Sequence, residues 1–130
     1  MRDIKYRALY AATNKWVYGY YVVLDSGYEL VECIWELGAK RATPIDRSTL
    51  GQFTGLTDKN GKEIYEGDIL GRYGYVVSFV DGADSAALGM PMGWYEQRDD
   101  FESYRQLEVG DIKEVIGNIH QHRYLLKEKN

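Results

Sequence analysis

Two histidines near the end of the chain are the residues best spaced to hold a metal ion. His120 and His122 are separated by one residue, so both side chains would point to the same face of an extended strand. A zinc site uses at least three protein ligands, and no nearby residue completes such a set. The single cysteine, Cys33, also excludes an internal disulfide and a zinc site built on several cysteines. We therefore expect no metal site, and we expect both histidines to lie exposed at a strand end.

Residue types used in catalysis are present, but not in the patterns that enzymes use. Cys33 has apolar neighbours and no histidine near it in sequence, which is typical of a buried cysteine rather than a nucleophile. Asp99, Asp100 and Glu102 lie in a charged run that is typical of a solvated turn. A general acid–base pair needs instead a pocket that separates two pKa values. We therefore expect that the protein is not an enzyme and needs no cofactor.

The segment around Asn60 matches two ligand-binding loops only in part. Gly55 and Gly61 have five residues between them, where a phosphate-binding P-loop has four, and Glu63 stands where that loop needs Ser or Thr. Asp58 and Asn60 resemble the start of a calcium loop, but a Lys occupies the third ligand position. The Asn60-Gly61 pair is instead typical of a tight turn, because both residues tolerate positive φ angles. The sequence therefore predicts a hairpin here.

Aromatic side chains form the binding surfaces that the sequence favours most. Trp16, Tyr18 and Tyr20 alternate along one apolar stretch, so they would share one face of a strand. On an exposed strand such side chains can bind a peptide or stack on bases. The alternative, which is the more common one, is that they pack in a core. The candidate interaction surface consists of Trp16, Tyr18, Tyr20, Tyr21, Arg72, Tyr73 and Tyr75.

The composition indicates one folded, acidic domain. The 130 residues are 45% hydrophobic and carry a formal net charge of −4 at pH 7. This apolar content suffices for a packed core. The acidic balance argues against nucleic acid as a partner, because phosphate contacts need clustered Lys and Arg. No apolar run approaches the ~20 residues of a membrane span, and Asp3 and Lys5 lie where the apolar core of a signal peptide would begin. We therefore expect a cytoplasmic protein with no membrane partner.

Short apolar stretches separated by turn residues predict a mainly β protein. The first part, residues 1–50, is expected to be an antiparallel meander that ends in a polar loop over 38–49. The boundary between the two parts is expected within 38–50. Residues 30–37 are also compatible with a short helix. The strands expected in this part are 4–8, 16–24 and 28–37.

The second part, residues 51–130, shows the same alternation of apolar stretches and turns. Before the strand that starts at Asp68, Gly67 permits the turn and the Asp68 carboxylate is expected to accept backbone N–H bonds. The same Gly-Asp pair recurs before Ile112. Asp81-Gly82 predicts a tight turn, followed by an irregular loop up to residue 93, and residues 96–102 predict a solvated turn. The expected strands are 68–73, 75–80, one that starts at 93, and 111–120 with a bend or bulge at Gly117.

Three motifs in order resemble the signature of the YopX-like family of phage and prophage proteins. The first comprises Asp3–Ala8 and Trp16–Tyr20, and the central one lies between Gln52 and Ile69. The closing motif comprises residues 115–119 followed by Leu125-Leu126. The resemblance covers the whole chain and is weakest between residues 81 and 107. It implies one domain over 1–130 with a complex β fold, in which the N-terminal meander is followed by an SH3-like barrel subdomain, and no established activity.

We therefore expect an accessory protein of a phage or prophage, in a bacterial host cell or a phage-infected cell, that acts through contacts with a protein partner. The alternative is a nucleic-acid-binding SH3-like module, since Lys59, Lys62 and Arg72 lie near aromatic residues. The strand 16–24 has no charge and no proline that would block pairing at its edge. A homo-oligomer that covers its aromatic side chains is therefore a further expectation.

Overall fold

The structure, a computed structural model, describes residues 5–10, 12–36, 38, 41–71, 74–98, 105–107 and 113–126. In this part of the chain it is mainly β, with two antiparallel sheets and one short α-helix. The chain divides into two compact units, Met1–Gly55 and Leu56–Asn130. The elements are β1 (Tyr6–Tyr10), β2 (Lys15–Asp25), β3 (Leu30–Glu36), β4 (Ala42–Pro44), β5 (Asp46–Thr57), β6 (Glu63–Tyr65), β7 (Asp68–Leu70), β8 (Tyr75–Val80), α1 (Gly82–Leu88), β9 (Gly93–Gln97), β10 (Arg105–Gln106), β11 (Val115–Asn118) and the 3₁₀ helix η1 (Arg123–Leu126).

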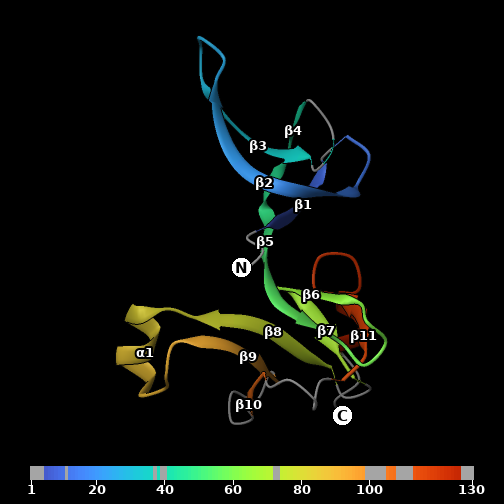
Figure 1. Cartoon of the computed structure of the whole chain (residues 1–130), viewed down its shortest axis with the longest axis vertical. Coiled ribbons are helices and arrows are strands. Elements are labelled where there is room, and N and C mark those ends of the chain that lie inside the picture. The colour runs from blue at the N-terminus through green and yellow to red at the C-terminus, as the bar shows by residue number, and fades with distance from the viewer. Residues whose placement is uncertain are drawn as a thin grey trace. The chain divides into compact units, whose positions relative to one another are not determined.

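The first sheet has six strands in the order β4-β3-β2-β1-β5-β6 (Figure 1). Strands β1 to β4 follow one another in the chain as antiparallel neighbours, which is the expected meander. Residues 30–36 are a strand and not a helix, because they pair with β2 on one side and with β4 on the other. Strand β5 lies beside β1, and the Thr49 hydroxyl accepts the Leu9 N–H at 2.8 Å.

The polar loop expected over residues 38–49 is wrong for most of its length. Residues 42–44 form β4, and β5 already begins at Asp46. Neither stretch is apolar, so neither carries the alternation that marks a strand in the sequence. Pairing of Thr43 with Ile34 and of Asp46 with Leu9 decides their structure.

The second sheet has five strands in the order β10-β9-β8-β7-β11 (Figure 1). The expected strands 75–80 and from 93 onward are confirmed as β8 and β9, and the expected irregularity at Gly117 is confirmed by a register shift between Val115 and Gly117. The core of this unit consists of Ile64, Leu70, Val77 and Val115. Within the described residues the sheet has open edges at β10 and β11 and is not a closed barrel.

The tight turn expected at Asp81-Gly82 is wrong, and so is the first half of the irregular loop expected over residues 83–93, because residues 82–88 form the helix α1. Asp81 is the N-cap of this helix: its carboxylate accepts the Asp84 N–H at 2.8 Å. Gly89 ends the helix with a φ of 69° and donates its N–H to the Ser85 carbonyl. Asp-Gly favours a turn and the start of a helix alike, and the small apolar residues that follow show no period on which to choose between the two.

Asp68 has the role that the sequence predicts. Its side chain is buried, and one carboxylate oxygen accepts the Tyr65 N–H at 2.8 Å. The preceding Gly67 donates its N–H to the Val77 carbonyl of β8 and accepts the N–H of Ile119, the residue after β11, so the turn is bonded to both segments. The second Gly-Asp pair, at 110–111, lies outside the described residues.

The hairpin predicted at Asn60-Gly61 is confirmed, with one difference in its backbone. Gly61 has a φ of 82°, but Asn60 is not among the described residues with positive φ. The Gly61 N–H binds the Asp58 carbonyl at 3.0 Å, and the Asp58 N–H binds the Lys62 carbonyl at 2.8 Å. These bonds define a turn that is followed by a glycine bulge rather than a two-residue turn.

The buried carboxylate of Asp58 connects this turn to a distant strand. One oxygen accepts the N–H groups of Asn60 and Lys62, at 2.8 and 2.9 Å. The other accepts the Val115 N–H of β11 at 2.9 Å, across 57 residues of sequence. Burial by itself would raise the pKa of the Asp58 carboxyl, but these three backbone donors outweigh it and hold the pKa below its ordinary value.

We expect Gly61→Val to lower the free energy of unfolding by about 1 kcal/mol or more, because a β-branched residue resists positive φ. The space around Gly61 is open, so a steric clash adds nothing to this loss. Gly61→Asn is the matched control, because Asn tolerates the left-handed conformation. Urea unfolding of the three proteins tests the prediction, and equal losses for Val and Asn would contradict it.

Asp58→Asn should lower the free energy of unfolding at pH 7 by about 2 kcal/mol, because the amide cannot accept hydrogen bonds on both sides. Asp25→Asn is the control: Asp25 accepts the Gly27 N–H at 2.8 Å in an exposed turn, a bond that the Asn oxygen can keep. The control should change stability by less than about 0.5 kcal/mol.

The loss caused by Asp58→Asn should also depend on pH. The folded-state pKa of Asp58 is lower than the unfolded value, so the stability it contributes is present above about pH 4 and is lost as the pH falls through the folded-state pKa. Unfolding free energies of both proteins at neutral and acidic pH test this. A difference that stays constant as the solution is acidified would show that the charge of Asp58 is not involved.

Candidate interaction surface

The aromatic residues predicted on the long strand are confirmed to lie in one strand, β2, and they divide between its two faces. Tyr18 and Tyr20 are 42% and 53% exposed. Trp16, on the same face, is half-buried, and the guanidinium of Arg7 lies 4.1 Å above its ring. Tyr21 lies on the other face, half-buried beside Tyr6. Strand β2 therefore presents its exposed aromatic side chains on the face of Tyr18 and Tyr20.

A residue that the sequence did not single out extends this surface. Trp35 of β3 lies directly opposite Tyr20 in the ladder, so the two share a face, and Trp35 is 42% exposed. Leu24, two further positions along that face of β2, is 45% exposed. The sequence predicts a strand over residues 28–37, but not its register with β2, so it does not reveal this pairing. We call Tyr18, Tyr20, Leu24 and Trp35 the hairpin surface.

The far end of the β2–β3 hairpin extends beyond its neighbouring strands (Figure 1). The pairing of β1 with β2 ends at Tyr6 and Gly19, whereas β2 and β3 continue to pair up to Asp25 and Leu30. At Gly19 the two backbones approach so closely that a Cβ atom would lie 2.0 Å from the Trp35 carbonyl oxygen. A side chain at this position would therefore displace β3 beside the hairpin surface.

Polar interactions fix the opposite face of the hairpin. The Tyr21 hydroxyl donates a hydrogen bond to Glu32, and Arg47 Nη1 lies 2.7 Å from the same carboxylate. The bond to Glu32, together with burial and the negative charge, raises the pKa of Tyr21 above its ordinary value. These contacts connect β2, β3 and β5, so the hairpin surface lies on a ribbon that is held on its reverse side.

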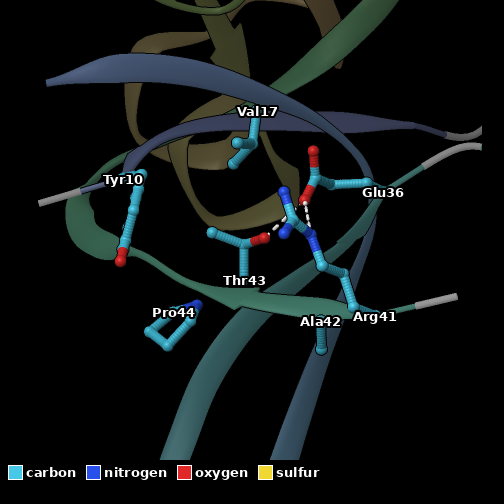
Figure 2. A pocket seen from close by; sticks show the side chains of 7 residues that line it. All are labelled: Tyr10, Val17, Glu36, Arg41, Ala42, Thr43 and Pro44. Atoms are coloured by element: carbon cyan, nitrogen blue, oxygen red, sulfur yellow. Dashed lines mark hydrogen bonds and ion pairs between the residues drawn. The ribbon is translucent and has the colours of Figure 1, made fainter. Parts of the chain in front are cut away.

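A small pocket of about 200 Å³ also lies on that reverse face. Figure 2 shows Tyr10 and Pro44 at one end, Glu36 and Arg41 at the other, and Thr43 between them. The Glu36 carboxylate accepts hydrogen bonds from the Thr43 hydroxyl and from Arg41 Nε, the latter at 3.1 Å. The bond from Thr43 is the main cause that lowers the pKa of Glu36. A carboxylate held in its ionised form is not placed to act as a general acid.

Three candidates for the interaction surface come from the second unit: Arg72, Tyr73 and Tyr75. Arg72 and Tyr73 lie outside the described residues, so only Tyr75 can be located. Tyr75 is half-buried at the start of β8. Lys113 Nζ lies 4.8 Å from the centre of its ring, and the Arg98 guanidinium carbon lies 5.9 Å from it. The ring of Tyr75 is therefore flanked by two cations of its own unit.

For Glu96 the predicted environment is wrong. The residue was expected in a solvated turn over 96–102, but it lies in β9, where only 3% of it is exposed. Lys113 Nζ lies 2.8 Å from one of its carboxylate oxygens, and Arg105 Nε lies 3.8 Å from the same oxygen. Pairing with Val77 places Glu96 on the core face of the sheet. The sequence around it is charged, so no apolar pattern could reveal this burial.

The two histidines lie in and after the turn that follows β11, half-buried rather than exposed as expected. The Nδ1 atom of His122 accepts the Asn118 N–H at 3.1 Å, and its ring lies against Gly117. Across the described residues, no three His, Cys, Asp or Glu side chains are grouped to hold a metal ion. Cys33 is buried, and burial raises the pKa of its thiol, which disfavours the reactive thiolate.

Two further expectations concern the carboxylate cluster and a membrane span. Asp99, Asp100 and Glu102 lie outside the described residues. In the described part of the chain no helix has the length and apolar character needed to cross a membrane.

Comparison with known proteins gives a family and a fold. Residues 5–127 match the family model described as YopX protein. Among solved structures, the crystal structure of protein EF1440 from Enterococcus faecalis is similar with a TM-score of 0.53 and 20% sequence identity, and the match covers 98% of this chain and 100% of that one. At this identity the likeness shows the fold alone. No curated protein matches the sequence.

The ion pair of Glu96 gives a prediction for stability. We expect Lys113→Met to lower the free energy of unfolding by about 2 kcal/mol, because it leaves a buried carboxylate without its nearest cation. Lys59→Met removes an exposed cation of the same unit and should change stability by less than about 0.5 kcal/mol. Urea unfolding compares the two variants. Equal, small effects would mean that solvent reaches Glu96 and compensates its charge.

Proposed function

The chain belongs to the YopX family, and from that premise we propose that it is a non-enzymatic accessory protein of a phage or prophage that acts by binding a protein through the hairpin surface. The observation that carries the proposal is the cross-strand pair of Tyr20 and Trp35, with about half of each aromatic side chain open to solvent. Large aromatic side chains are enriched at protein interfaces, because they bury much area at a low cost in side-chain entropy.

The surroundings of this pair support an interface more than a core. A core residue lies between two layers, whereas Tyr18, Tyr20 and Trp35 are each more than two-fifths exposed on one face of a ribbon. The reverse face is held by the contacts of Tyr21, Glu32 and Arg47. Pre-ordering of this kind lowers the entropic cost of binding.

The chemistry of the described residues supports the non-enzymatic part of the proposal. The pocket of Figure 2 contains a single carboxylate, Glu36, which two donors hold ionised. The more deeply buried Glu96 is paired with Lys113 in the core face of the other unit. Catalysis by proton transfer needs two groups with separated pKa values in one site.

We also propose the finer description of the second unit, an SH3-like fold, and with it a second candidate function in nucleic-acid binding. Its support is the antiparallel sheet of five strands with Tyr75 flanked by Lys113 and Arg98. The net charge of −4 and the pairing of Lys113 with Glu96 oppose it. The hairpin surface therefore remains the first candidate.

A capture experiment tests the proposal. The tagged full chain, its Tyr20→Lys variant and a Tyr124→Lys control are used to capture proteins from a lysate of induced or infected bacterial cells, with and without nuclease. Tyr124 matches Tyr20 in type and is 61% exposed in the other unit. We expect a protein that the wild type and the control capture equally with or without nuclease, and that Tyr20→Lys loses.

Two results would contradict the proposal. If Tyr20→Lys captures the same protein as the wild type while its circular dichroism and melting temperature are unchanged, the hairpin surface is not the binding site. If capture disappears on nuclease treatment, the second candidate function replaces the first.

A further inference from the structure

The pocket of Figure 2 has an apolar end and a polar end. Its lining comes from β1, β2, β3 and β4, together with the residue before β4. Tyr10 and Pro44 each present a ring at the apolar end, and Val17 adds its methyl groups to the wall. A cavity of about 150 Å³ accommodates a benzene ring. The volume of about 200 Å³ therefore suits one ring with a small polar substituent.

The polar end keeps hydrogen-bonding groups that the protein does not use. The Thr43 hydroxyl and Arg41 Nε both donate to the same oxygen of Glu36, Oε2. Within the described part of the chain, no hydrogen bond involves Glu36 Oε1 or the two Nη groups of Arg41. Because Nε and Oε2 are 3.1 Å apart, the unused acceptor and the unused donors belong to adjoining groups.

The charges at this end favour a neutral ligand. Of the seven residues that line the pocket, only Glu36 and Arg41 are charged, and their charges cancel. An anion would be attracted by Arg41 but repelled by Glu36, and a cation would meet the reverse. A primary amide has a carbonyl acceptor and an N–H donor on the same carbon atom. It can therefore bind both residues without adding a net charge.

We propose that this pocket binds a small, neutral ring compound that carries a primary amide. The ring packs against Tyr10 and Pro44, and the amide lies at the polar end. There its NH₂ group donates to Glu36 Oε1 and its carbonyl accepts an N–H from Arg41. The buried Thr43 hydroxyl holds the carboxylate in place for this contact. The site lies on the face opposite the hairpin surface, so it does not depend on the proposed function.

Benzamide is the probe for this site. The experiment follows the backbone amide signals of the isotope-labelled full chain in NMR titrations at neutral pH. We expect saturable shifts centred on Val17, Ala42 and Thr43, with a Kd in the millimolar range that is usual for so small a ligand.

Three further probes divide the ligand into its parts. Benzoate and benzylammonium keep the ring but carry a charge, and each should bind at least about threefold more weakly, because each meets a like charge. Butyramide keeps the amide but lacks the ring. It should also bind at least about threefold more weakly, because it buries less apolar area against Tyr10 and Pro44.

Arg41→Met tests the contact with the amide. It should weaken benzamide binding by about threefold to tenfold, the range for the loss of one hydrogen bond. It also leaves Glu36 as the only charge in the pocket, so benzylammonium should become the preferred probe. Arg47→Met is the matched control, because Arg47 is paired with Glu32 at 2.7 Å in the same unit but does not line the pocket. The control should bind every probe like the wild type.

Three results would overturn the proposal. The first is that benzamide causes no saturable shift of the amide signals around the pocket. The second is that butyramide or either charged probe binds as tightly as benzamide. The third is that Arg41→Met and Arg47→Met have the same effect, since Arg41 would then make no contact with the ligand. None of these results bears on capture by the hairpin surface, so the two proposals can fail separately.

Discussion

The second unit depends on the way the Asp58 carboxylate is satisfied. A buried carboxylate is costly unless hydrogen bonds replace the water it loses. Here two donors come from its own turn, and the third comes from Val115 in β11. One carboxylate therefore links the stability of the turn to that of the distant strand. The core residues Ile64, Leu70 and Val115 pack beside this link, and Asp68 provides a similar bond one strand later.

In the first unit the main feature is the partial exposure of aromatic side chains. Its sheet carries many aromatic side chains, and the strands around β2 cover only part of them. Tyr6 and Tyr21 contact each other, and Arg7 covers Trp16. Tyr20 and Trp35 have no such cover among the described residues, since β1 stops pairing at Gly19 and β4 is only three residues long. The length of the hairpin, which exceeds that of its neighbours, is thus the cause of the exposed surface to which we assign binding.

Three carboxylates of the described part of the chain are held by ion pairs within their own units. Glu96 is held by Lys113, Glu36 by Arg41 and Thr43, and Glu32 by Arg47, each within one unit of the chain.

The sequence alone determined the features that depend on neighbours in the chain. The mainly β class, the turns at Asn60-Gly61 and Gly67-Asp68 and the aromatic strand β2 follow from local patterns, and each is present in the structure. Three motifs in order were enough to indicate the family.

Tertiary structure alone decided what depends on distant partners. Strand β4 is a strand because β3 lies beside it, and Glu96 is buried because β9 aligns it with Val77. The helix α1 was hidden for another reason, since Asp-Gly before small residues permits both a turn and a helix. The pairing of Tyr20 with Trp35 could not be predicted either, because register is set by contacts across the sheet and not by either strand alone.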